Sequence, residues 1–323
     1  MSIALNVFQE QKDLKNKKRY NEGYRLVGNH SAVKVCAYCK KAITGKDVCY
    51  KNTFYGIESW RCVQMSPTFF CDHRCVFCWR DIDYVWPKWQ GPIDNPKEIV
   101  EGCIKAHIEL LQGFKGNNKA IEERLKDMGK PLHFAISLTG EPTMYPRLPE
   151  MINYIKEKGM TAFLVTNGTI PDMVEKLIEH QPTQLYISVY GCNKEMHQRT
   201  ANPITKDAWE RLNKSLSMMN KFNRNVMRLT LVRGFNFMDP EGYAELIEKY
   251  KPMFVEAKGY SFVGHSQERL EVNNMPYHHE IMEFAKRIEE NSGYKVIDSK
   301  EESRVALLVR EDFGGRKMDF EEL

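Results

Sequence analysis

Three cysteines in one short loop are the residues of this chain whose spacing points most directly to chemistry. Cys71, Cys75 and Cys78 are arranged as C-x3-C-x2-C, and a short apolar run at residues 68–70 precedes them. A [4Fe–4S] cluster is held by cysteine thiolates, normally four of them. Because this loop offers three, one iron of such a cluster would stay open for a ligand that does not belong to the protein.

This spacing, with an aromatic residue directly before the last cysteine, resembles the signature of radical S-adenosylmethionine (SAM) enzymes. In that superfamily the open iron binds the amino and carboxylate groups of SAM. The alternatives are a zinc site and buried structural thiols. Zinc sites usually pair two C-x2-C units about 15–20 residues apart. The two such units here begin at Cys36 and Cys75, which are farther apart, and a zinc site would leave Cys71 unused. We therefore predict a cluster.

The composition is that of a folded chain without a membrane span or a secretory signal. The chain has 323 residues, which suits two domains or one α/β barrel, and 42% of its residues are apolar. It contains no run of about 18 apolar residues, and residues 1–20 are charged without a continuous apolar stretch. The nine cysteines then favour metal binding or catalysis in the cytoplasm over disulfides. Because the net charge is only +4, nucleic-acid binding would depend on local basic patches.

Two segments precede the three-cysteine loop. Residues 1–30 include a basic arm, which we interpret as a solvated, frayed terminus in preference to an arm that contacts phosphates. Its charged residues are Lys12, Lys15, Lys17, Lys18 and Arg19. Residues 31–70 carry four further cysteines and little helical periodicity, which indicates a loop-rich segment held together by a metal centre.

A regular alternation of helices and strands begins near residue 92. Asn95, Pro96 and Glu98 have the pattern of a helix N-cap, a first helical position and a capping-box acid. The apolar face of this helix includes Cys103 and His107, which we interpret as core residues and not as ligands. The predicted strands cover 132–136, 161–165, 184–189, 227–232 and 255–258. Two predicted helices cover about 148–158 and 207–221, and two more begin at about 171 and 240.

Repeated strand–helix units of this length imply parallel strands with right-handed crossovers. A strand directly before Cys71 brings the number of units to six. We therefore predict an α/β fold, a partial (β/α)6 TIM-like barrel of the radical SAM type with an N-terminal cysteine-rich, cluster-binding extension. The predicted parts are an N-terminal arm and second-cluster segment (1–65), a radical SAM core (66–265) and a C-terminal extension packed on the core (266–323). The extension should contain a helix near 278–290 and a strand at 305–309.

Ligands of such folds bind at the carboxyl ends of the strands. Gly140 and Glu141 follow one strand within Thr-Gly-Glu-Pro. This resembles the Gly-Gly-Glu element that meets the methionine amino group of SAM in radical SAM enzymes, with Thr139 in place of one glycine. Glycine permits close backbone approach to a ligand, and a carboxylate suits an ammonium group. Asn167 and Ser188 end two further strands and are also candidate SAM contacts, with turn capping as the alternative for both.

A second set of cysteines precedes the first. Cys36, Cys49 and Cys62 are separated by 13 positions each, and Lys51 follows Cys49 in a Cys-Tyr-Lys element. Together with the later Cys-Asp-His-Arg-Cys-Val-Phe-Cys-Trp-Arg run, this pattern closely resembles the tRNA-wybutosine synthesising enzymes of the TYW1/Taw1 family. The resemblance covers about residues 36–310. The chain is too short for the flavodoxin-like domain of the eukaryotic members, so it resembles the shorter archaeal form.

The resemblance implies a specific reaction. Enzymes of this family condense N1-methylguanosine, which lies beside the anticodon of phenylalanine tRNA (tRNA-Phe), with two carbons of pyruvate. The product is 4-demethylwyosine, and the enzymes are SAM-dependent carbon–carbon lyases. By this resemblance Cys36, Cys49 and Cys62 hold a second [4Fe–4S] cluster with an open iron, and Lys51 forms a Schiff base with pyruvate. Cys39 stays unassigned, as a free thiol or an alternative ligand. We also expect an external electron donor of the flavodoxin or ferredoxin type and a monomeric enzyme.

The chemistry of an amine agrees with this role for Lys51. A lysine attacks a ketone only when it is neutral, and burial or a nearby positive centre lowers its pKa and supplies that form. Iron and Arg61 would crowd Lys51 in this way. The alternative is a solvated surface lysine, but the position of Lys51 between Cys49 and Cys62 supports the functional interpretation.

Aromatic and basic residues alternate directly after the three-cysteine loop. Such a stretch suits stacking on splayed-out bases of a tRNA loop, and core or lid packing is the alternative. The predicted tRNA contacts are Trp79, Arg80, Trp86 and Lys88, and Tyr84 and Trp89 belong to the same stretch. Four arginines could add phosphate contacts, although the sequence does not orient them: Arg199, Arg224, Arg228 and Arg233.

Two other functions remain open at this point. One is an Fe–S or zinc nucleic-acid-binding protein without catalysis, against which the six strand–helix units and the Gly140-Glu141 element argue. The other is a radical SAM enzyme that acts on a different, small-molecule substrate. The second cysteine set and the aromatic–basic stretch argue against that alternative.

Overall fold

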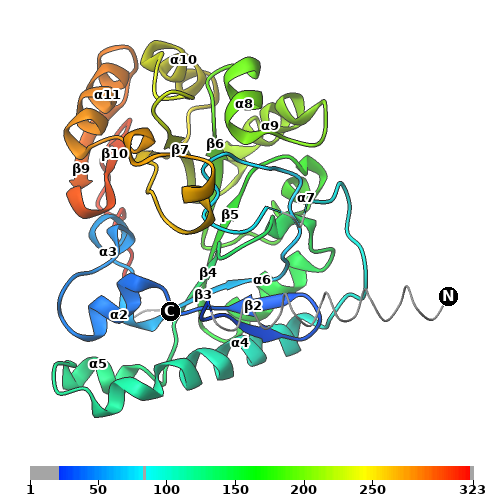
Figure 1. Cartoon of the computed structure of the whole chain (residues 1–323), viewed down its shortest axis with the longest axis vertical. Helices are drawn as coiled ribbons and strands as arrows, with labels where there is room; N and C mark the ends of the chain where they lie inside the picture. The colour runs from blue at the N-terminus through cyan, green and yellow to red at the C-terminus, as the bar shows by residue number, and fades with distance from the viewer. Residues whose placement is uncertain (1–21, 83–84, 321–323) are drawn as a thin grey trace.

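The computed structural model describes residues 22–82 and 85–320. Within these ranges the chain forms one ten-stranded sheet in the order β1-β2-β3-β4-β5-β6-β7-β8-β10-β9 (Figure 1). The charged residues of the basic arm, from Lys12 to Arg19, and Tyr84 lie outside the described residues. None of the helices in the described ranges is both long enough and apolar enough to traverse a lipid bilayer.

Six parallel strands form the centre of the sheet, and each pairs with the next one along the chain. They are β3 (Cys62–Ser66), β4 (His133–Ile136), β5 (Thr161–Thr166), β6 (Gln184–Val189), β7 (Asn225–Leu231) and β8 (Phe254–Gly259). The two edges of the sheet do not pair with each other among the described strands. The predicted partial barrel is therefore confirmed.

The first of these strands differs from the prediction. The sequence predicts a strand directly before the three-cysteine loop, but β3 ends earlier, at Ser66. Pro67 follows, and proline has no N–H with which to continue a ladder. The next residues bend instead, and the Phe70 N–H donates to Thr68 Oγ1 at 3.0 Å. A strand before Cys71 is thus confirmed, although it ends five positions before that cysteine, and Cys62 is its first residue.

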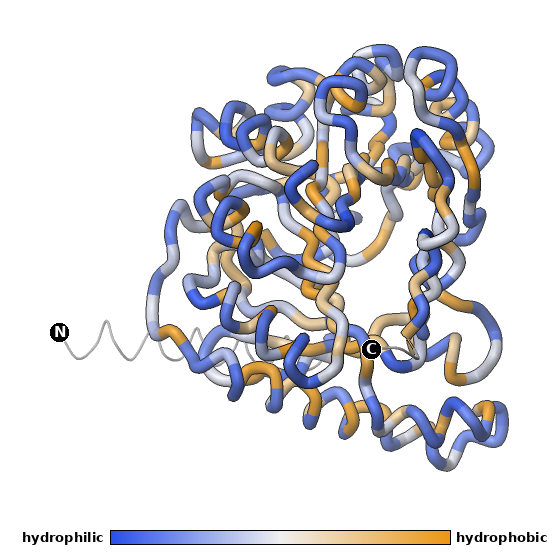
Figure 2. Tube along the Cα trace, turned by 180° about the vertical axis from the view of Figure 1, so that it is seen from behind, coloured by the Kyte–Doolittle hydropathy of each residue, from blue (hydrophilic) through white to orange (hydrophobic). Residues whose placement is uncertain are grey.

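Helices cover the outer face of the sheet. The short α5 (Glu122–Asp127) lies elsewhere, in an apolar cluster with Val35 and Ile43. The covering helices are α4 (Pro96–Leu111), α6 (Leu148–Glu157), α7 (Pro171–Lys176), α8 (Lys194–Ala201), α9 (Ala208–Leu216) and α10 (Pro240–Tyr250). The first begins as predicted, because the Asn95 side chain accepts a hydrogen bond from the Lys97 N–H at 2.9 Å. Its amphipathic pattern is visible along the lower edge of Figure 2. Cys103 and His107 are buried on its apolar face, as expected of core residues.

Strand residues alternate between the two faces of the sheet. Outward side chains such as Leu164 and Leu229 join the main core under the helices. Inward side chains such as Phe163 and Phe254 form a second apolar cluster with α3 (Tyr50–Tyr55). This helix therefore packs inside the partial barrel, in the space that we call the lumen. Polar inward residues follow toward the carboxyl ends of the strands.

Antiparallel strands extend both edges of the sheet. β1 (Arg25–Val27) and β2 (Ser31–Val33) lie beside β3, and β10 (Val305–Val309) and β9 (Lys295–Lys300) lie beside β8. The predicted strand at 305–309 is confirmed, as is the helix near 278–290, which is α11 (His278–Glu290). One sheet thus runs through all three predicted parts of the chain, and the boundaries near 65 and 265 stay predictions.

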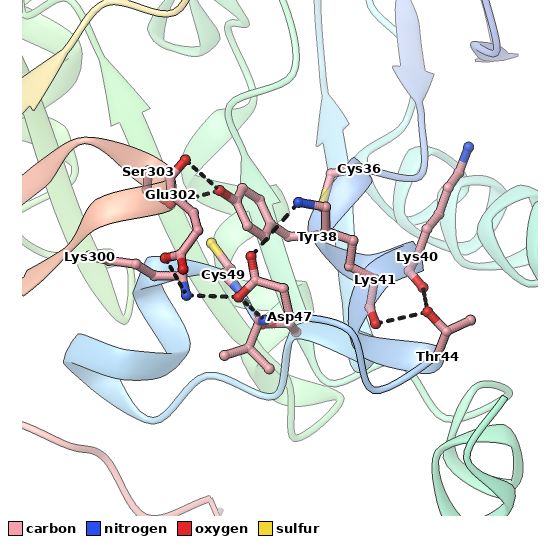
Figure 3. Close-up of polar contacts among 12 residues, drawn as sticks. Cys36, Tyr38, Lys40, Lys41, Thr44, Asp47, Cys49, Lys300, Glu302 and Ser303 are labelled. Carbon is pink, nitrogen blue, oxygen red and sulfur yellow. Dashed lines mark hydrogen bonds and ion pairs between the residues drawn. The ribbon is translucent and has the colours of Figure 1, made fainter. Parts of the chain in front are cut away.

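The cysteine-rich segment crosses the open side of the barrel. Its helices, α2 (Ala37–Ile43) and α3, lie between β3 and the β9–β10 hairpin (Figure 1). Figure 3 shows the contacts that hold it there. The Tyr38 hydroxyl lies 2.9 Å from Ser303 Oγ, and Lys300 Nζ lies 2.7 Å from Asp47 Oδ1. The proposed second-cluster segment is thereby tied to the C-terminal extension.

Candidate active site

The three-cysteine loop lies beyond the carboxyl end of β3. Cys71 and Cys75 are buried, and Cys78 is partly exposed. Burial raises the pKa of the Cys71 thiol to about 12. Burial, together with the charges of Cys78 and Cys71, raises the pKa of Cys75 well above its ordinary value. The three sulfurs are therefore close enough to act on one another. Such thiols become thiolates when a metal replaces their protons, so the donor set fits an iron–sulfur cluster.

Arg80 lies against the same loop. Its guanidinium is hydrogen-bonded to the Cys71 side chain. Burial lowers the pKa of Arg80, but the charges of Cys78 and Cys71 outweigh burial and raise it. The side chain is thus placed to offset the negative charge of cluster-bound thiolates. Its predicted contact with tRNA stays a prediction.

Asn167, directly after β5, holds the three-cysteine loop in place. Its Nδ2 donates to Asp72 Oδ1 at 2.6 Å and lies 3.1 Å from His73 Nδ1. The Thr169 hydroxyl donates to the other oxygen of the Asp72 carboxylate. All four side chains are buried, so water does not compete for these hydrogen bonds. Asn167 therefore positions the loop, and its contact with SAM stays a prediction.

Gly140 lies where the loop after β4 meets the segment before Cys71. Its φ is +67°, and a Cβ atom there would stand 2.2 Å from the Thr68 carbonyl oxygen and 2.8 Å from that of Phe70. Only glycine can occupy this position without displacing backbone. The sequence suggested close approach to a ligand, whereas the close approach in the structure is to the protein's own backbone.

The Glu141 carboxylate joins the ends of two strands. It accepts hydrogen bonds from the Thr143 N–H at 3.0 Å, the Thr166 hydroxyl at 2.6 Å and the Asn167 N–H at 2.8 Å. Burial raises the pKa of Glu141, and these hydrogen bonds oppose the rise. Glu141 thus fixes the end of β4 against the end of β5, beside the three-cysteine loop. Its contact with the amino group of SAM stays a prediction.

Ser188 lies on the inner face of β6 and is buried. Its hydroxyl is hydrogen-bonded to Tyr190. Burial raises the pKa of Tyr190, and the charges of Cys75 and Glu141 raise it further. Tyr190 therefore lies among Ser188, the loop after β4 and the three-cysteine loop. The structure brings these elements together at the carboxyl ends of the strands, where the strand order places them.

The second cysteine set comes from three different elements. Cys36 is the N-cap of α2, Cys49 is the N-cap of α3, and Cys62 is the first residue of β3. Burial raises the pKa of Cys36 to about 11, and the charge of Cys49 contributes. Burial also raises the pKa of Cys62, with contributions from both other thiols. These three side chains are therefore close neighbours, and as partly buried thiols they fit the same kind of cluster.

Cys39 packs differently from Cys36. Its side chain is buried in an apolar cluster with Val35 and Ile43. The thiol lies 3.8 Å from the Trp60 carbonyl oxygen, and the Cys39 N–H donates to Cys36 Sγ at 3.2 Å. These contacts support a free structural thiol for Cys39, which the sequence left open.

Lys51 lies in the lumen beside the second cysteine set, because the charges of Cys49 and Cys62 act on it. Cys62 begins β3 and the other set follows its end, so about 13 Å of strand separates them at roughly 3.3 Å per residue. Lys51 Nζ lies 4.1 Å from the centre of the Tyr186 ring and 5.7 Å from that of Phe163. Both rings belong to the apolar cluster inside the barrel. The lysine therefore does not occupy an open surface site.

The surroundings of Lys51 favour the neutral amine. Burial lowers its pKa, Glu256 opposes this, and Arg228 adds to it. The sequence suggested Arg61 as the positive neighbour, and this was wrong. Arg61 instead pairs with Glu58 at 2.7 Å and donates to the Lys130 carbonyl at 2.8 Å. A pKa lowered in this way raises the fraction of amine that can attack a carbonyl at neutral pH.

Charged residues on β7 and β8 complete the lumen, and the sequence analysis missed their role there. Glu256 is buried and accepts hydrogen bonds from the Tyr55 hydroxyl at 2.8 Å and the Tyr50 hydroxyl at 3.1 Å. Arg228 Nε lies 4.0 Å from Glu256. Burial lowers the pKa of Lys258 to about 8. One feature of the sequence could have indicated this role. Glu256 and Lys258 are charged residues two positions apart in a strand that is otherwise apolar, so both side chains point to the same face of the sheet.

The residues predicted to contact tRNA fall into two groups. Trp79 packs parallel to Tyr24, with ring centres 6.3 Å apart, and Lys34 Nζ lies 5.3 Å from its centre. Trp86 is 37% exposed, and Lys88 beside it is also exposed. Trp79 therefore packs within the protein, which was the alternative to tRNA contact. Trp86 and Lys88 are accessible to a large ligand.

All four arginines suggested for phosphate contacts interact with other groups of the protein, and of these Arg199 donates to the Phe235 carbonyl and Arg233 pairs with Glu280. Arg228 faces the lumen, and Arg224 donates to the carbonyls of Gly315 and Arg316 at 2.8 Å.

No three Cys, His, Asp or Glu side chains in residues 22–82 and 85–320 converge as ligands of a single metal ion. Cysteines of a [4Fe–4S] cluster bind different irons and stand farther apart, so this finding does not bear on the proposed clusters.

Comparison with known proteins identifies the family. Residues 65–247 match the model of the radical SAM superfamily, and residues 249–310 match a model described as wyosine base formation. The chain is 45% identical over 295 residues to the SAM-dependent tRNA 4-demethylwyosine synthase of Pyrococcus abyssi, which covers 90% of this chain and 86% of that protein. The chain belongs to the TYW1 family of radical SAM enzymes. The predicted family is thereby confirmed, and membership implies SAM and one [4Fe–4S] cluster.

Solved TYW1 structures share the whole fold. One, described as TYW1 with a lysine–pyruvate adduct bound, has a TM-score of 0.84 and 36% identity over 96% of this chain and 98% of that chain. A crystal structure of an archaeal TYW1 has a TM-score of 0.77 and 33% identity over 96% of this chain and 99% of that one. The similarity therefore includes the cysteine-rich segment and the C-terminal extension as well as the radical SAM core.

Proposed function

We propose that this chain is a SAM-dependent tRNA 4-demethylwyosine synthase. It would condense N1-methylguanosine, beside the anticodon of tRNA-Phe, with two carbons of pyruvate. The observation that carries the proposal is a partly buried lysine, Lys51, held in the lumen over the Tyr186 ring and beside Cys49 and Cys62. Because only two of the three pyruvate carbons enter the product, a carbon–carbon bond of pyruvate breaks, which makes the enzyme a carbon–carbon lyase.

Each cysteine set has its own proposed role. Cys71, Cys75 and Cys78 would hold the radical SAM cluster, which supplies the electron for reductive cleavage of SAM. The second set, Cys36, Cys49 and Cys62, would hold a further [4Fe–4S] cluster near Lys51. The protein's own contribution is to shield both sets partly from water and to fix the first loop against the strand ends through Asn167 and Glu141.

Lys51 would bind pyruvate covalently. Its neutral amine adds to the keto carbon, the keto oxygen leaves as water, and a C=N bond replaces the C=O bond. Burial beside Tyr186 favours the neutral amine and excludes competing water. The Schiff base would hold the pyruvate methyl group in the lumen, on the path between Lys51 and the strand ends.

The proposed function also implies further partners and contacts. We propose that an external electron donor of the flavodoxin or ferredoxin type reduces the enzyme, that the enzyme acts in the cytoplasm, and that it is a monomer. Gly140, Glu141, Asn167 and Ser188 would surround SAM, and Trp86 and Lys88 would contact tRNA.

The function is tested by anaerobic incubation of the reconstituted enzyme with SAM, pyruvate and N1-methylguanosine-containing tRNA-Phe. Nucleoside mass spectrometry should then show 4-demethylwyosine, and unmethylated tRNA should give none. Formation of 5′-deoxyadenosine without any tricyclic nucleoside would contradict this substrate and point to a different radical SAM reaction.

The two tryptophans are expected to behave differently. Trp86→Ala should weaken tRNA binding by about 1–3 kcal/mol, because an exposed ring that stacks on a base contributes about that much. Trp86→Phe keeps an aromatic face and should retain most of the affinity. Trp79→Ala removes packing against Tyr24 and should mainly lower the melting temperature. Filter binding at several salt concentrations and thermal denaturation measure both effects. Equal tRNA affinity of Trp86→Ala and wild type would remove Trp86 from the interface.

A further inference from the structure

Arg228 is a partly buried cation in the lumen, and its Nε donor is not used by the described residues. It lies on β7, in register with Ser188 on β6 and Glu256 on β8. Its side chain is 22% exposed, and its Nε has no hydrogen-bond partner among the described residues. Buried polar groups normally have partners, so an unpartnered guanidinium nitrogen in a site for small molecules is a donor available to a ligand.

The nearest carboxylate does not satisfy Arg228. Glu256 Oε2 is 4.0 Å from Nε, which is too long for a hydrogen bond. Both Glu256 oxygens already accept hydrogen bonds, from Tyr55 at 2.8 Å and Tyr50 at 3.1 Å. Glu256 therefore offsets part of the charge but leaves the Nε donor free.

Several basic side chains lie around the same carboxylate. The electrostatic neighbours of Glu256 are Lys51, Lys258 and Arg228, three basic side chains around one carboxylate. Lys51 must be neutral to attack a carbonyl, so it cannot serve as the counter-ion of a bound anion at that moment. A guanidinium remains protonated and presents two parallel N–H donors that match a carboxylate.

We propose that Arg228 binds the carboxylate of the 2-oxo acid whose keto carbon reacts with Lys51, and so selects 2-oxo acids over uncharged ketones. The proposal deepens the proposed function and rests on the assignment of Lys51. Both side chains border Tyr186, because Lys51 Nζ lies 4.1 Å from the ring centre and Arg228 is an electrostatic neighbour of the same residue. The carboxylate and keto carbon of a 2-oxo acid are directly bonded, so their two anchors must be close together.

The carboxylate of SAM is the other possible source of this anion. Arg228 is also an electrostatic neighbour of Tyr190. The charge of Cys75, in the three-cysteine loop, acts on Tyr190 as well. We assign the pyruvate carboxylate, because Arg228 and Lys51 both border Tyr186 on the inner face of β6, and Arg228 Nε lies 4.0 Å from Glu256, whose charge also acts on Lys51. Measuring SAM binding and pyruvate capture separately distinguishes the two.

The experiment captures the Schiff base in the anaerobically reconstituted full chain, without SAM or tRNA. Pyruvate or hydroxyacetone, in which an alcohol replaces the carboxylate, is added over a concentration range with cyanoborohydride. Mass spectrometry then quantifies the adduct on the Lys51 peptide. For Arg228→Met, labelling by subsaturating pyruvate should fall about tenfold or more, the effect expected when a hydrogen bond to a charged group is lost. Labelling by hydroxyacetone should change little.

Two further variants make the result specific. Arg228→Lys keeps the charge next to Glu256 but loses the planar fork, and it should show a smaller loss of preference for pyruvate. Arg287→Met removes an exposed arginine of α11 that pairs with Glu241, and it should label as wild type. Iron content and thermal denaturation establish that each variant is folded. If Arg228→Met does not fold, the comparison of pyruvate with hydroxyacetone labelling in Arg228→Lys tests the proposal by itself. A reduced preference for pyruvate supports it, and an unchanged preference overturns it.

The outcomes separate this proposal from the proposed function. If both Arg228 variants prefer pyruvate over hydroxyacetone as strongly as the wild type does, the role of Arg228 is overturned and the proposed function is unaffected. Undiminished pyruvate labelling with loss of SAM binding also overturns it, and assigns Arg228 to the SAM carboxylate. Absence of any Lys51 adduct in the wild type overturns the Schiff-base assignment, and this proposal with it.

Discussion

Lys51→Ala is expected to abolish formation of 4-demethylwyosine while SAM cleavage remains detectable. The variant keeps both cysteine sets but loses the amine that would hold pyruvate in the lumen. Lys51→Arg should fail as well, because a guanidinium stays protonated and cannot attack a ketone. Anaerobic turnover with SAM, pyruvate and methylated tRNA, followed by nucleoside mass spectrometry, measures the product, and 5′-deoxyadenosine measures SAM cleavage in the same sample.

A second buried lysine provides an internal control for this prediction. Lys258 also lies in the lumen, where burial lowers its pKa to about 8, and its Nζ donates to the Ser303 carbonyl at 2.6 Å. Reductive trapping should place the three-carbon adduct on the peptide with Lys51 and not on that with Lys258. Adduct formation should increase with pH and level off below 10.5, because the pKa of Lys51 is lowered from that value. A normal rate of product formation by Lys51→Ala would show that pyruvate is held without a Schiff base.

Replacement of Cys71, Cys75 and Cys78 by Ala should remove about half of the iron and all formation of 5′-deoxyadenosine. One of two proposed [4Fe–4S] clusters would be lost, and with it the open iron that binds SAM. Iron and sulfide analysis after anaerobic reconstitution gives the first quantity, and chromatography of the SAM cleavage products gives the second. The expected loss of activity is complete because this loop contains all three predicted ligands.

The second set provides the matched variant. Replacement of Cys36, Cys49 and Cys62 by Ala should also halve the iron but leave some uncoupled SAM cleavage. Cys192→Ala should leave the iron unchanged, because Cys192 lies 3.1 Å from an Asp239 oxygen and belongs to neither set. Complete loss of iron from either triple variant would indicate one shared centre or an unfolded segment.

Local spacing explains which features could be predicted from the sequence. The radical SAM cysteines lie within eight consecutive positions, so their spacing alone brings them together. The α4 cap at Asn95 depends on neighbouring residues. The alternation of strands and helices likewise follows from periodicity within each segment, and parallel order then places Glu141, Asn167 and Ser188 at one end of the barrel.

Tertiary structure alone determined the surroundings of Lys51. The Tyr55–Glu256 hydrogen bond joins residues 201 positions apart, and the Arg228–Glu256 contact depends on the register of β7 and β8. No local pattern encodes such pairs, because burial and electrostatic partners are set by packing of distant segments. For the same reason the expected positive neighbour, Arg61, was wrong, and Trp79 could not be separated from Trp86 before their packing was known. The sequence by itself determined which residues can do chemistry, and the folded chain decided which of them meet.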